Sequence, residues 1–213
     1  MAVKSSFKNM TICLFAICLV CSALLAGVYA LTAEPIATAA ASKNEAAIKE
    51  VLPDAAVTIE EERTVEMNGQ TYAYNLAYDV EGNTVGCAIN VTTLGFGGPI
   101  VIKVGFDVEG NIWNTKVLSQ AETPGLGAKC TEAAFAEQFK GFNPTEKKLS
   151  VKKDGGDVDA ITASTITSRA YTNGLATAVN VFWTITGTPM LLDAASGAST
   201  SEWSEPSSSE NQN

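Results

Sequence analysis

The most chemically suggestive stretch of the chain is residues 159–168, DAITASTITS, which crowds hydroxyl side chains just after a glycine pair. An apolar-periodic run begins at Ile166, so a helix is predicted to start near Thr165. Its free N–H groups and the positive end of its dipole then lie among these hydroxyls. Such a place binds an anion, phosphate above all. The alternative is that Thr162 or Ser164 is an ordinary N-cap of this helix.

Two glycine-containing stretches accompany the hydroxyl cluster. Residues 94–100 read LGFGGPI, and three glycines within four residues permit a close backbone approach that other residues would block. Residues 122–127 read ETPGLG and join a predicted strand to a predicted helix. Each stretch alone indicates a turn. Together with the hydroxyls, they shift the balance from an ordinary helix cap toward a binding site.

The 213-residue chain contains no histidine. This absence excludes nucleophiles activated by an imidazole, His-ligated zinc and His-ligated haem. We therefore predict no catalytic residue and no metal site, so a cofactor has to supply any redox atoms. Cys87 and Cys130 either form one disulfide or remain buried thiols. The net charge of −9 argues against nucleic acid or anionic lipid as a partner.

Strands mixed with helices must position these stretches. Helical periodicity marks Thr131–Lys140 and Ile166–Trp183. The turn word DVEGN occurs twice, at Asp79–Asn83 and Asp107–Asn111, which we interpret as a good turn used twice. We predict an α+β domain over residues 43–193, with a mixed or antiparallel sheet and flanking helices. Strand composition marks Val57–Glu61, Thr64–Met67, Tyr72–Asp79, Thr84–Thr92, Ile100–Val108 and Ile112–Leu118.

The N-terminal region holds 22 residues without a charge, Met10–Leu31, which as one transmembrane helix cross a bilayer core of roughly 30 Å. A cleaved signal peptide is the alternative, although the apolar run is long for one. The positive-inside rule keeps residues 1–9 in the cytoplasm and places the folded domain outside. The remaining segments are a linker at 32–42, a small amphipathic helix at Asn44–Leu52 and a disordered acidic, Ser-rich tail at 194–213.

The three stretches together resemble the flavin-binding domain of the G subunit of Rnf-type electron transport complexes, and of the related C subunit of sodium-pumping NADH:quinone reductase. That family's pattern is an Asp, two residues, a Ser or Thr, two small residues and a Thr that carries FMN through a phosphoester bond. Here the pattern falls on Asp159, Thr162 and Thr165. The resemblance runs from Met10 to Met190 and implies covalent attachment of FMN at Thr165.

The resemblance also implies which residues surround the flavin, since the ETPGLG motif lies beside the isoalloxazine ring in this family. The family usually has Ser-Gly-Ala-Thr where this chain has Thr162, Ala163, Ser164 and Thr165. Ser164 places an additional hydroxyl beside the expected acceptor, so attachment at Ser164 is an alternative. The implied cofactor-binding residues are Glu122, Thr123, Gly125, Leu126, Gly127, Thr162, Ser164, Ile166 and Thr167.

The function implied by the resemblance is that of a membrane-anchored electron carrier in an ion-translocating ferredoxin:NAD⁺ oxidoreductase complex. The chain would be a redox subunit of a translocase without catalysis of its own. Its implied partners are the other integral and peripheral subunits and a magnesium-dependent flavin transferase that installs FMN from FAD. Three alternatives are a stand-alone anchored flavoprotein, the C subunit of a sodium-pumping quinone reductase, and an anchored adhesion or scaffold domain.

Overall fold

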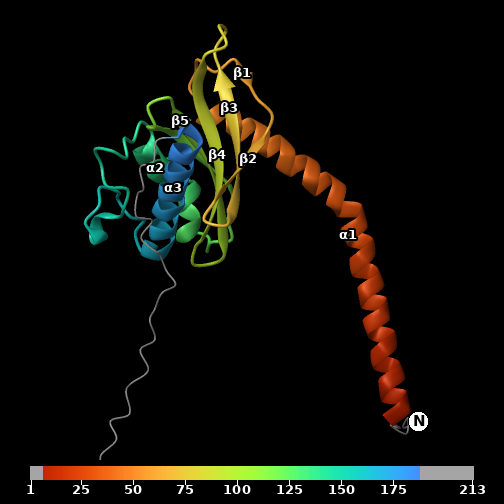
Figure 1. The fold of residues 1–213 in the computed structure, drawn as a ribbon. Coiled ribbons are helices and arrows are strands. Elements are labelled where there is room, and N and C mark those ends of the chain that lie inside the picture. The colour runs from red at the N-terminus through yellow and green to blue at the C-terminus, as the bar shows by residue number, and fades with distance from the viewer. Residues whose placement is uncertain (1–6, 188–213) are drawn as a thin grey trace, which may run out of the picture. The chain divides into compact units, whose positions relative to one another are not determined.

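A computed structural model describes residues 7–187 and divides the chain into two units, one ending at Glu45 and one beginning at Ala46. The first unit is helical, and the second contains a sheet with its helices (Figure 1). Residues 1–6 of the predicted cytoplasmic segment and the predicted tail at 194–213 lie outside the described residues.

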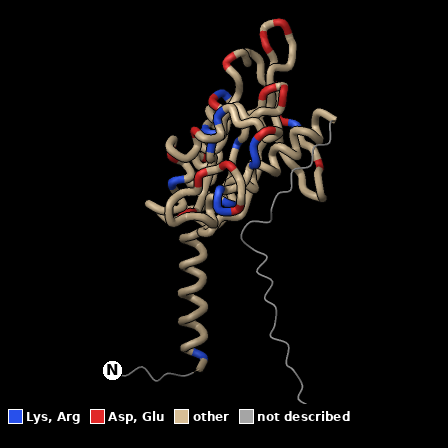
Figure 2. The backbone as a smooth tube through the Cα atoms, turned by 90° about the vertical axis from the view of Figure 1, so that its left-hand side faces the viewer, with Lys and Arg blue, Asp and Glu red and all other residues tan. Residues whose placement is uncertain are grey.

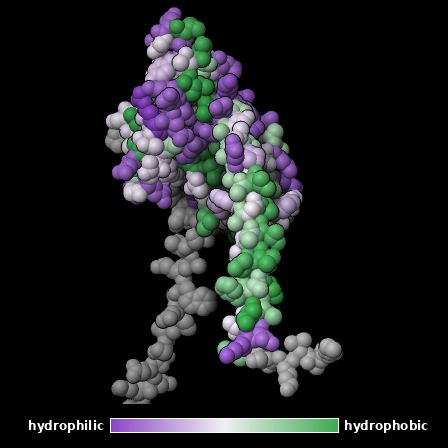
Figure 3. Space-filling view, turned by 90° about the vertical axis from the view of Figure 1, so that its right-hand side faces the viewer, coloured by the Kyte–Doolittle hydropathy of each residue, from purple (hydrophilic) through white to green (hydrophobic). Residues whose placement is uncertain are grey.

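Helix α1 (Phe7–Val51) contains the predicted span at Met10–Leu31 and is long and apolar enough to cross a membrane. The N-terminal part of α1 has no charged residue except a basic one near its start (Figure 2), and its surface is mostly hydrophobic (Figure 3). Residues 32–42, predicted as a linker, are helical, because a run rich in alanine, the best helix former, outweighs Pro35. The helix predicted at Asn44–Leu52 is therefore the last part of α1.

The second unit is built on a six-stranded antiparallel sheet in the order β1-β3-β4-β5-β6, with β2 also pairing with β3. Short connections favour this antiparallel arrangement. The six predicted strands are confirmed, with ends within two residues of the expected ones. The strands are β1 (Thr58–Ile59), β2 (Arg63–Met67), β3 (Gln70–Tyr78), β4 (Thr84–Leu94), β5 (Pro99–Asp107) and β6 (Ile112–Ser119).

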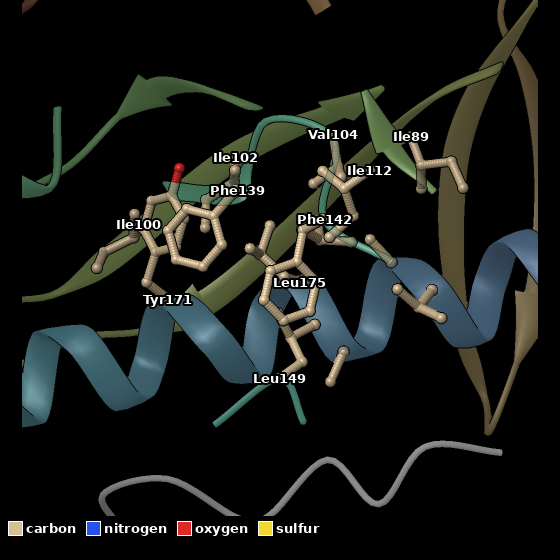
Figure 4. Packing of buried hydrophobic residues seen from close by; sticks show 14 of the residues in the cluster. Ile89, Ile100, Ile102, Val104, Ile112, Phe139, Phe142, Leu149, Tyr171 and Leu175 are labelled. Carbon is tan, nitrogen blue, oxygen red and sulfur yellow. The ribbon is translucent and has the colours of Figure 1, made fainter. Parts of the chain in front are cut away.

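Helix α3 (Thr165–Thr186) lies along one face of this sheet and confirms the helix predicted at Ile166–Trp183. Its buried residues, such as Tyr171 and Leu175, point toward alternate side chains of β5, including Ile102 (Figure 4). Burial of this apolar face against the sheet stabilises the domain.

The prediction of one continuous helix over Thr131–Lys140 is wrong. Glu132 has extended backbone angles, φ −78° and ψ 143°, which interrupt the helix. The predicted pair Phe135 and Phe139 still packs together, with ring centroids 5.4 Å apart, and each ring lies 5.1 Å from Tyr171. Tertiary packing of these aromatic rings thus determines the local backbone. The segment consists of η1 (Gly127–Thr131), α2 (Ala133–Ala136) and η2 (Glu137–Phe139).

The two DVEGN turns have the same internal hydrogen bonds. Asp79 Oδ1 accepts the backbone N–H of Glu81 at 2.8 Å and that of Asn83 at 2.9 Å. The Asp107 carboxylate makes the corresponding two bonds, both at 2.9 Å. Because these turns connect β3 to β4 and β5 to β6, they lie at the same end of the sheet.

The opposite face of the sheet buries a lysine. Lys103 on β5 is fully buried, and its Nζ donates a hydrogen bond to Asn75 Oδ1 at 3.3 Å. Burial lowers the pKa of Lys103 to about 8, and the charge of Glu62 opposes this effect. The cysteines of the domain are also buried: Cys87 and Cys130 are free thiols rather than a disulfide. Burial raises their pKa values to about 12 and about 11.

Candidate functional site

Three loops meet at the end of the sheet opposite the DVEGN turns. The first connects β4 to β5 and contains LGFGGPI, the second follows β6 and contains ETPGLG, and the third precedes α3 and contains the hydroxyl cluster. Strand register places the first two side by side, since Leu94 opposes Pro99 and Val101 opposes Ser119. The stretches predicted to form one site therefore converge in space.

Glu122 joins the three loops. Its side chain is buried, and its Oε1 accepts the backbone N–H of Gly97 at 3.0 Å while its Oε2 accepts the hydroxyl of Thr167 at 2.7 Å. Gly97 belongs to the first loop and Thr167 to the first turn of α3. Hydrogen bonds to both oxygens compensate for part of the cost of burying a carboxylate. In the described chain no ion pair involves Glu122.

Glycine is required at three positions around Glu122. A Cβ on Gly95 would lie 2.1 Å from Glu122 Oε1, and one on Gly127 would lie 2.2 Å from Oε2. A Cβ on Gly97 would lie 2.2 Å from the carbonyl oxygen of Ala121. These distances are far below van der Waals contact, so any larger residue would displace the carboxylate or the backbone. The glycines of the LGFGGPI and ETPGLG motifs thus have a packing role that composition alone does not reveal.

The hydroxyl cluster is a tight turn closed by Ser168. The Ser168 hydroxyl accepts the backbone N–H of Ile161 and donates to the carbonyl oxygen of Ser164, both at 2.9 Å. Within this turn Ala163 has φ +62°, a left-handed conformation that favours glycine. The turn therefore contains local strain at the position where the family pattern has glycine.

The N-terminus of α3 has no side-chain cap. Ser164 is the N-cap residue, but its hydroxyl makes no capping hydrogen bond, contrary to the interpretation of Thr162 or Ser164 as an ordinary cap. The first intrahelical bond at this end runs from Ser168 N–H to Ser164 O. The N–H groups of the first turn are thus left for another acceptor, and the helix dipole favours an anionic one.

Thr165 is the first residue of α3, and its hydroxyl lies beside a positive charge. Lys153 Nζ donates to Thr165 Oγ1 at 3.4 Å. One turn further along α3, Arg169 forms a bidentate pair with Asp154, with N–O distances of 2.6 and 2.7 Å. This hydrogen-bonded pairing lowers the pKa of Asp154 below its usual range. Because the Arg169–Asp154 pair is neutral, Lys153 is what places a positive charge beside Thr165.

A cavity of about 430 Å³ opens where the three loops meet. Seven of the nine implied cofactor-binding residues and the implied attachment residue Thr165 line it, together with Phe96 and Ala163. Gly125 and Thr162 do not, although Gly125 sets the shape of its loop with φ +76°. The lining residues are Phe96, Glu122, Thr123, Leu126, Gly127, Ala163, Ser164, Thr165, Ile166 and Thr167.

Asp159, the first residue of the implied attachment motif, faces a different cavity, of about 370 Å³, which Thr162 also lines. Its exposed carboxylate pairs with Lys152 at 2.8 Å. Its backbone is held by Gln138, which accepts the Asp159 N–H at 2.8 Å and donates to the Asp159 carbonyl at 3.2 Å. The motif is thus divided between two adjacent hollows.

Sequence reasoning missed four residues of this region. Phe96 lies in the glycine-rich motif LGFGGPI but receives no role from sequence reasoning. An aromatic residue flanked by glycines could have indicated a ring-binding position. Ala163 and Ser168 belong to the hydroxyl cluster, and only the backbone geometry distinguishes them from their neighbours. Lys153 gave no signal, because its contact with Thr165 spans 12 positions of sequence.

The cavity suits a phosphorylated ring compound. Its volume falls within the range of roughly 300–1,000 Å³ that is typical of ligand pockets. Phe96, Leu126 and Ile166 give it an apolar rim, and they are exposed by 71%, 45% and 39%. The uncapped N-terminus of α3 offers N–H donors for a phosphate at the same opening. An apolar ring and an anionic group, both present in FMN, find matching surroundings here.

Fold and site define a helix-anchored domain with a binding site for a phosphorylated cofactor. Comparison with known proteins identifies the family within this class. Residues 95–180 match the FMN-binding domain family, and residues 1–51 match the RnfG N-terminal region. The chain is 35% identical over 167 residues to the G subunit of the ion-translocating oxidoreductase complex of Methanosarcina acetivorans, covering 76% of this chain and 86% of the relative. The chain belongs to the family of G subunits of ion-translocating oxidoreductase complexes.

Other relatives match to different extents. The G subunit of the proton-translocating ferredoxin:NAD(+) oxidoreductase complex of Clostridium ljungdahlii is 29% identical, covering 84% of this chain and 91% of the relative. The corresponding G subunit of Stutzerimonas stutzeri is 39% identical over 99 residues, and the chain spans only 43% of that relative. The crystal structure of the C subunit of the Na(+)-translocating NADH-quinone reductase of Parabacteroides distasonis aligns with a TM-score of 0.43 and 25% identity, covering 55% of this chain and 72% of that one.

Proposed function

We propose that this protein is a membrane-anchored electron carrier whose FMN is attached covalently to Thr165, working within a multi-subunit ion-translocating oxidoreductase complex. One observation carries the proposal: three loops distant in sequence converge on one cavity that contains Thr165 and the uncapped start of α3. Membership of the G-subunit family, with its FMN-binding domain, supports the nature of the cofactor. FMN supplies redox chemistry to a chain that has no histidine to ligate a haem.

Each part of the cavity has a task in this proposal. The N–H groups at the start of α3 stabilise the negative charge that the phosphodiester keeps. Phe96, Leu126 and Ile166 cover apolar surface of the ring system and exclude water from it. Glu122 fixes the spacing of the loops through Gly97 and Thr167. The covalent bond prevents loss of the cofactor to the surrounding medium.

The context of the carrier is also part of the proposal. Helix α1 anchors the chain, its basic N-terminal flank stays in the cytoplasm, and the folded domain lies outside. The electron donor and acceptor are then other subunits of the complex, which as a whole acts as a translocase. A separate flavin transferase installs FMN, as the resemblance to this family implies.

The test is the mass of the peptide that contains residues 160–169, taken from full-length protein produced together with a flavin transferase. We expect the wild-type peptide and the Ser164→Ala peptide to carry the added mass of FMN. We expect the Thr165→Val peptide to carry none, because valine keeps the shape of threonine but lacks the hydroxyl oxygen. In-gel fluorescence under denaturing conditions gives an independent reading. An unmodified wild-type peptide refutes covalent attachment, and FMN retained by Thr165→Val but lost by Ser164→Ala moves the attachment site to Ser164.

A further inference from the structure

The segment Lys152–Asp154 forms a short 3-10 helix (η3), whose side chains are hydrogen-bonded to Thr165 and Arg169 at the start of α3. Two of its three charged side chains are paired across the site: Lys152 with Asp159 at 2.8 Å, and Asp154 with Arg169 in a bidentate pair. These two pairs tie η3 to both ends of the hydroxyl turn. The residue between them, Lys153, is therefore held in place from both sides.

The backbone around η3 fixes this placement further. Lys152 N–H donates to Val158 O at 2.8 Å, and Gly155, with φ +75°, ends the 3-10 helix. A Cβ on Gly156 would lie 2.0 Å from Ser150 O, so the chain reverses in a space that only glycine fits. The glycine pair that precedes the hydroxyl cluster thus lets the chain reverse direction, so that side chains of η3 reach the start of α3.

Lys153 differs from its neighbours in what it faces. Of the ion pairs in the described chain none includes Lys153, and its hydrogen bond goes to Thr165 Oγ1 at 3.4 Å. The carboxylate nearest along the chain, Asp154, is already engaged by Arg169. A cation thus lies beside one particular hydroxyl, at the end of a helix whose N–H groups also favour an anion.

We propose that Lys153 positions the flavin phosphate on Thr165, both during attachment and in the finished protein. This inference rests on the proposed function. In the attachment step the Thr165 oxygen bonds to the flavin-side phosphorus of FAD, the bond from that phosphorus to the AMP oxygen breaks, and AMP leaves with the electron pair. The hydroxyl proton goes to a base of the transferase or to water. The product phosphodiester keeps one negative charge, and the Lys153 ammonium lies within reach of it.

The test compares initial rates of FMN attachment to purified apo-protein by the transferase with FAD and magnesium. Loss of an exposed charge-assisted contact slows the reaction of Lys153→Gln by about three- to tenfold. Lys153→Arg keeps the charge and stays near the wild-type rate. Lys148→Gln is the matched control: it removes the same charge from an exposed lysine that also acts on Asp154 but has no contact with Thr165. This control stays within about twofold of wild type.

A salt series separates this electrostatic role from a merely structural one. At about 1 M NaCl, where the Debye length is about 3 Å, the difference between wild type and Lys153→Gln shrinks toward nothing. Thermal unfolding of the apo variants shows whether the fold is retained. Attachment to Lys153→Gln at the wild-type rate, or a deficit that persists at high salt, overturns the role of Lys153 alone. Absence of attachment to the wild-type protein overturns both this inference and the proposed function.

Discussion

The two ends of the sheet use glycine turns for opposite purposes. At one end the DVEGN turns satisfy their own backbone donors, since Asp79 and Asp107 each accept two N–H groups. At the other end the glycines bring three loops against the buried carboxylate of Glu122, and the start of α3 has no side-chain cap. The backbone N–H groups of the DVEGN turns are thus hydrogen-bonded within the turns, while N–H groups at the start of α3 remain available to a ligand.

This difference shows that a glycine's environment matters more than its presence. Gly82, in the first DVEGN turn, has φ +85° and nothing within 4 Å of an added Cβ, so its role is conformational. Gly127 has no left-handed backbone, but an added Cβ would meet Glu122 and Thr167. The first glycine serves the turn, and the second serves the spacing of the site.

The largest effect that separates the two ends is expected from Gly127→Ala. The added methyl group collides with Glu122 Oε2 at 2.2 Å and with Thr167 Oγ1 at 2.7 Å, so the carboxylate must move and the cavity deforms. We expect a loss of about 1–3 kcal/mol in the free energy of unfolding and a marked fall in FMN attachment, measured by denaturant unfolding and by flavin fluorescence.

Gly82→Ala is the matched control, with the same substitution at the other end. Its left-handed backbone costs about 1 kcal/mol for a residue with a Cβ, while FMN attachment stays at the wild-type level. Equal attachment to both variants would contradict the division between a structural and a functional end.

Much of the fold followed from sequence because its signals are local. The six strands and α3 have clear composition and periodicity, and the turn words between them are strong. The continuous α1 was missed because Pro35 suggested a break that the alanine-rich surroundings overcome. The interruption at Glu132 was missed because the packing of Phe135 and Phe139 against Tyr171 decides it, and such packing is not visible in a local window.

The candidate site was predictable to a similar degree, with a similar limit. The resemblance pointed to most residues that line the cavity, because they occur in two short words. It did not reveal that Asp159 and Thr162 face a second hollow, nor that Lys153 lies beside Thr165. Both facts depend on how η3 and the hydroxyl turn fold back on each other, which involves contacts between separate segments.

A smaller effect is expected from Ala163→Gly, which relieves the strain stored at the functional end. Ala163 has φ +62°, and glycine adopts this conformation without the Cβ clash. The gain is partly offset by the greater freedom of glycine in the unfolded chain, so we expect stabilisation of up to about 1 kcal/mol in denaturant unfolding. Ala163→Val should act in the opposite direction, because a β-branched side chain disfavours this region. Destabilisation by glycine would show that the turn is not strained at Ala163.

The smallest effect concerns how the stability of the end of the sheet with the DVEGN turns depends on pH. Hydrogen bonds from the backbone and then the side chain of Asn83 lower the pKa of Asp79 below its ordinary value of 3.8. A carboxyl with a depressed pKa stabilises the fold above that ordinary value, and this contribution is lost as the pH falls through the lower, folded-state pKa. Asp79→Asn keeps an oxygen acceptor but does not titrate. We therefore expect the advantage of wild type over Asp79→Asn in urea unfolding to shrink between about pH 5 and about pH 2. Parallel stability curves over that interval would mean that the carboxylate charge adds nothing to the turn, and that its backbone geometry alone holds this end of the sheet.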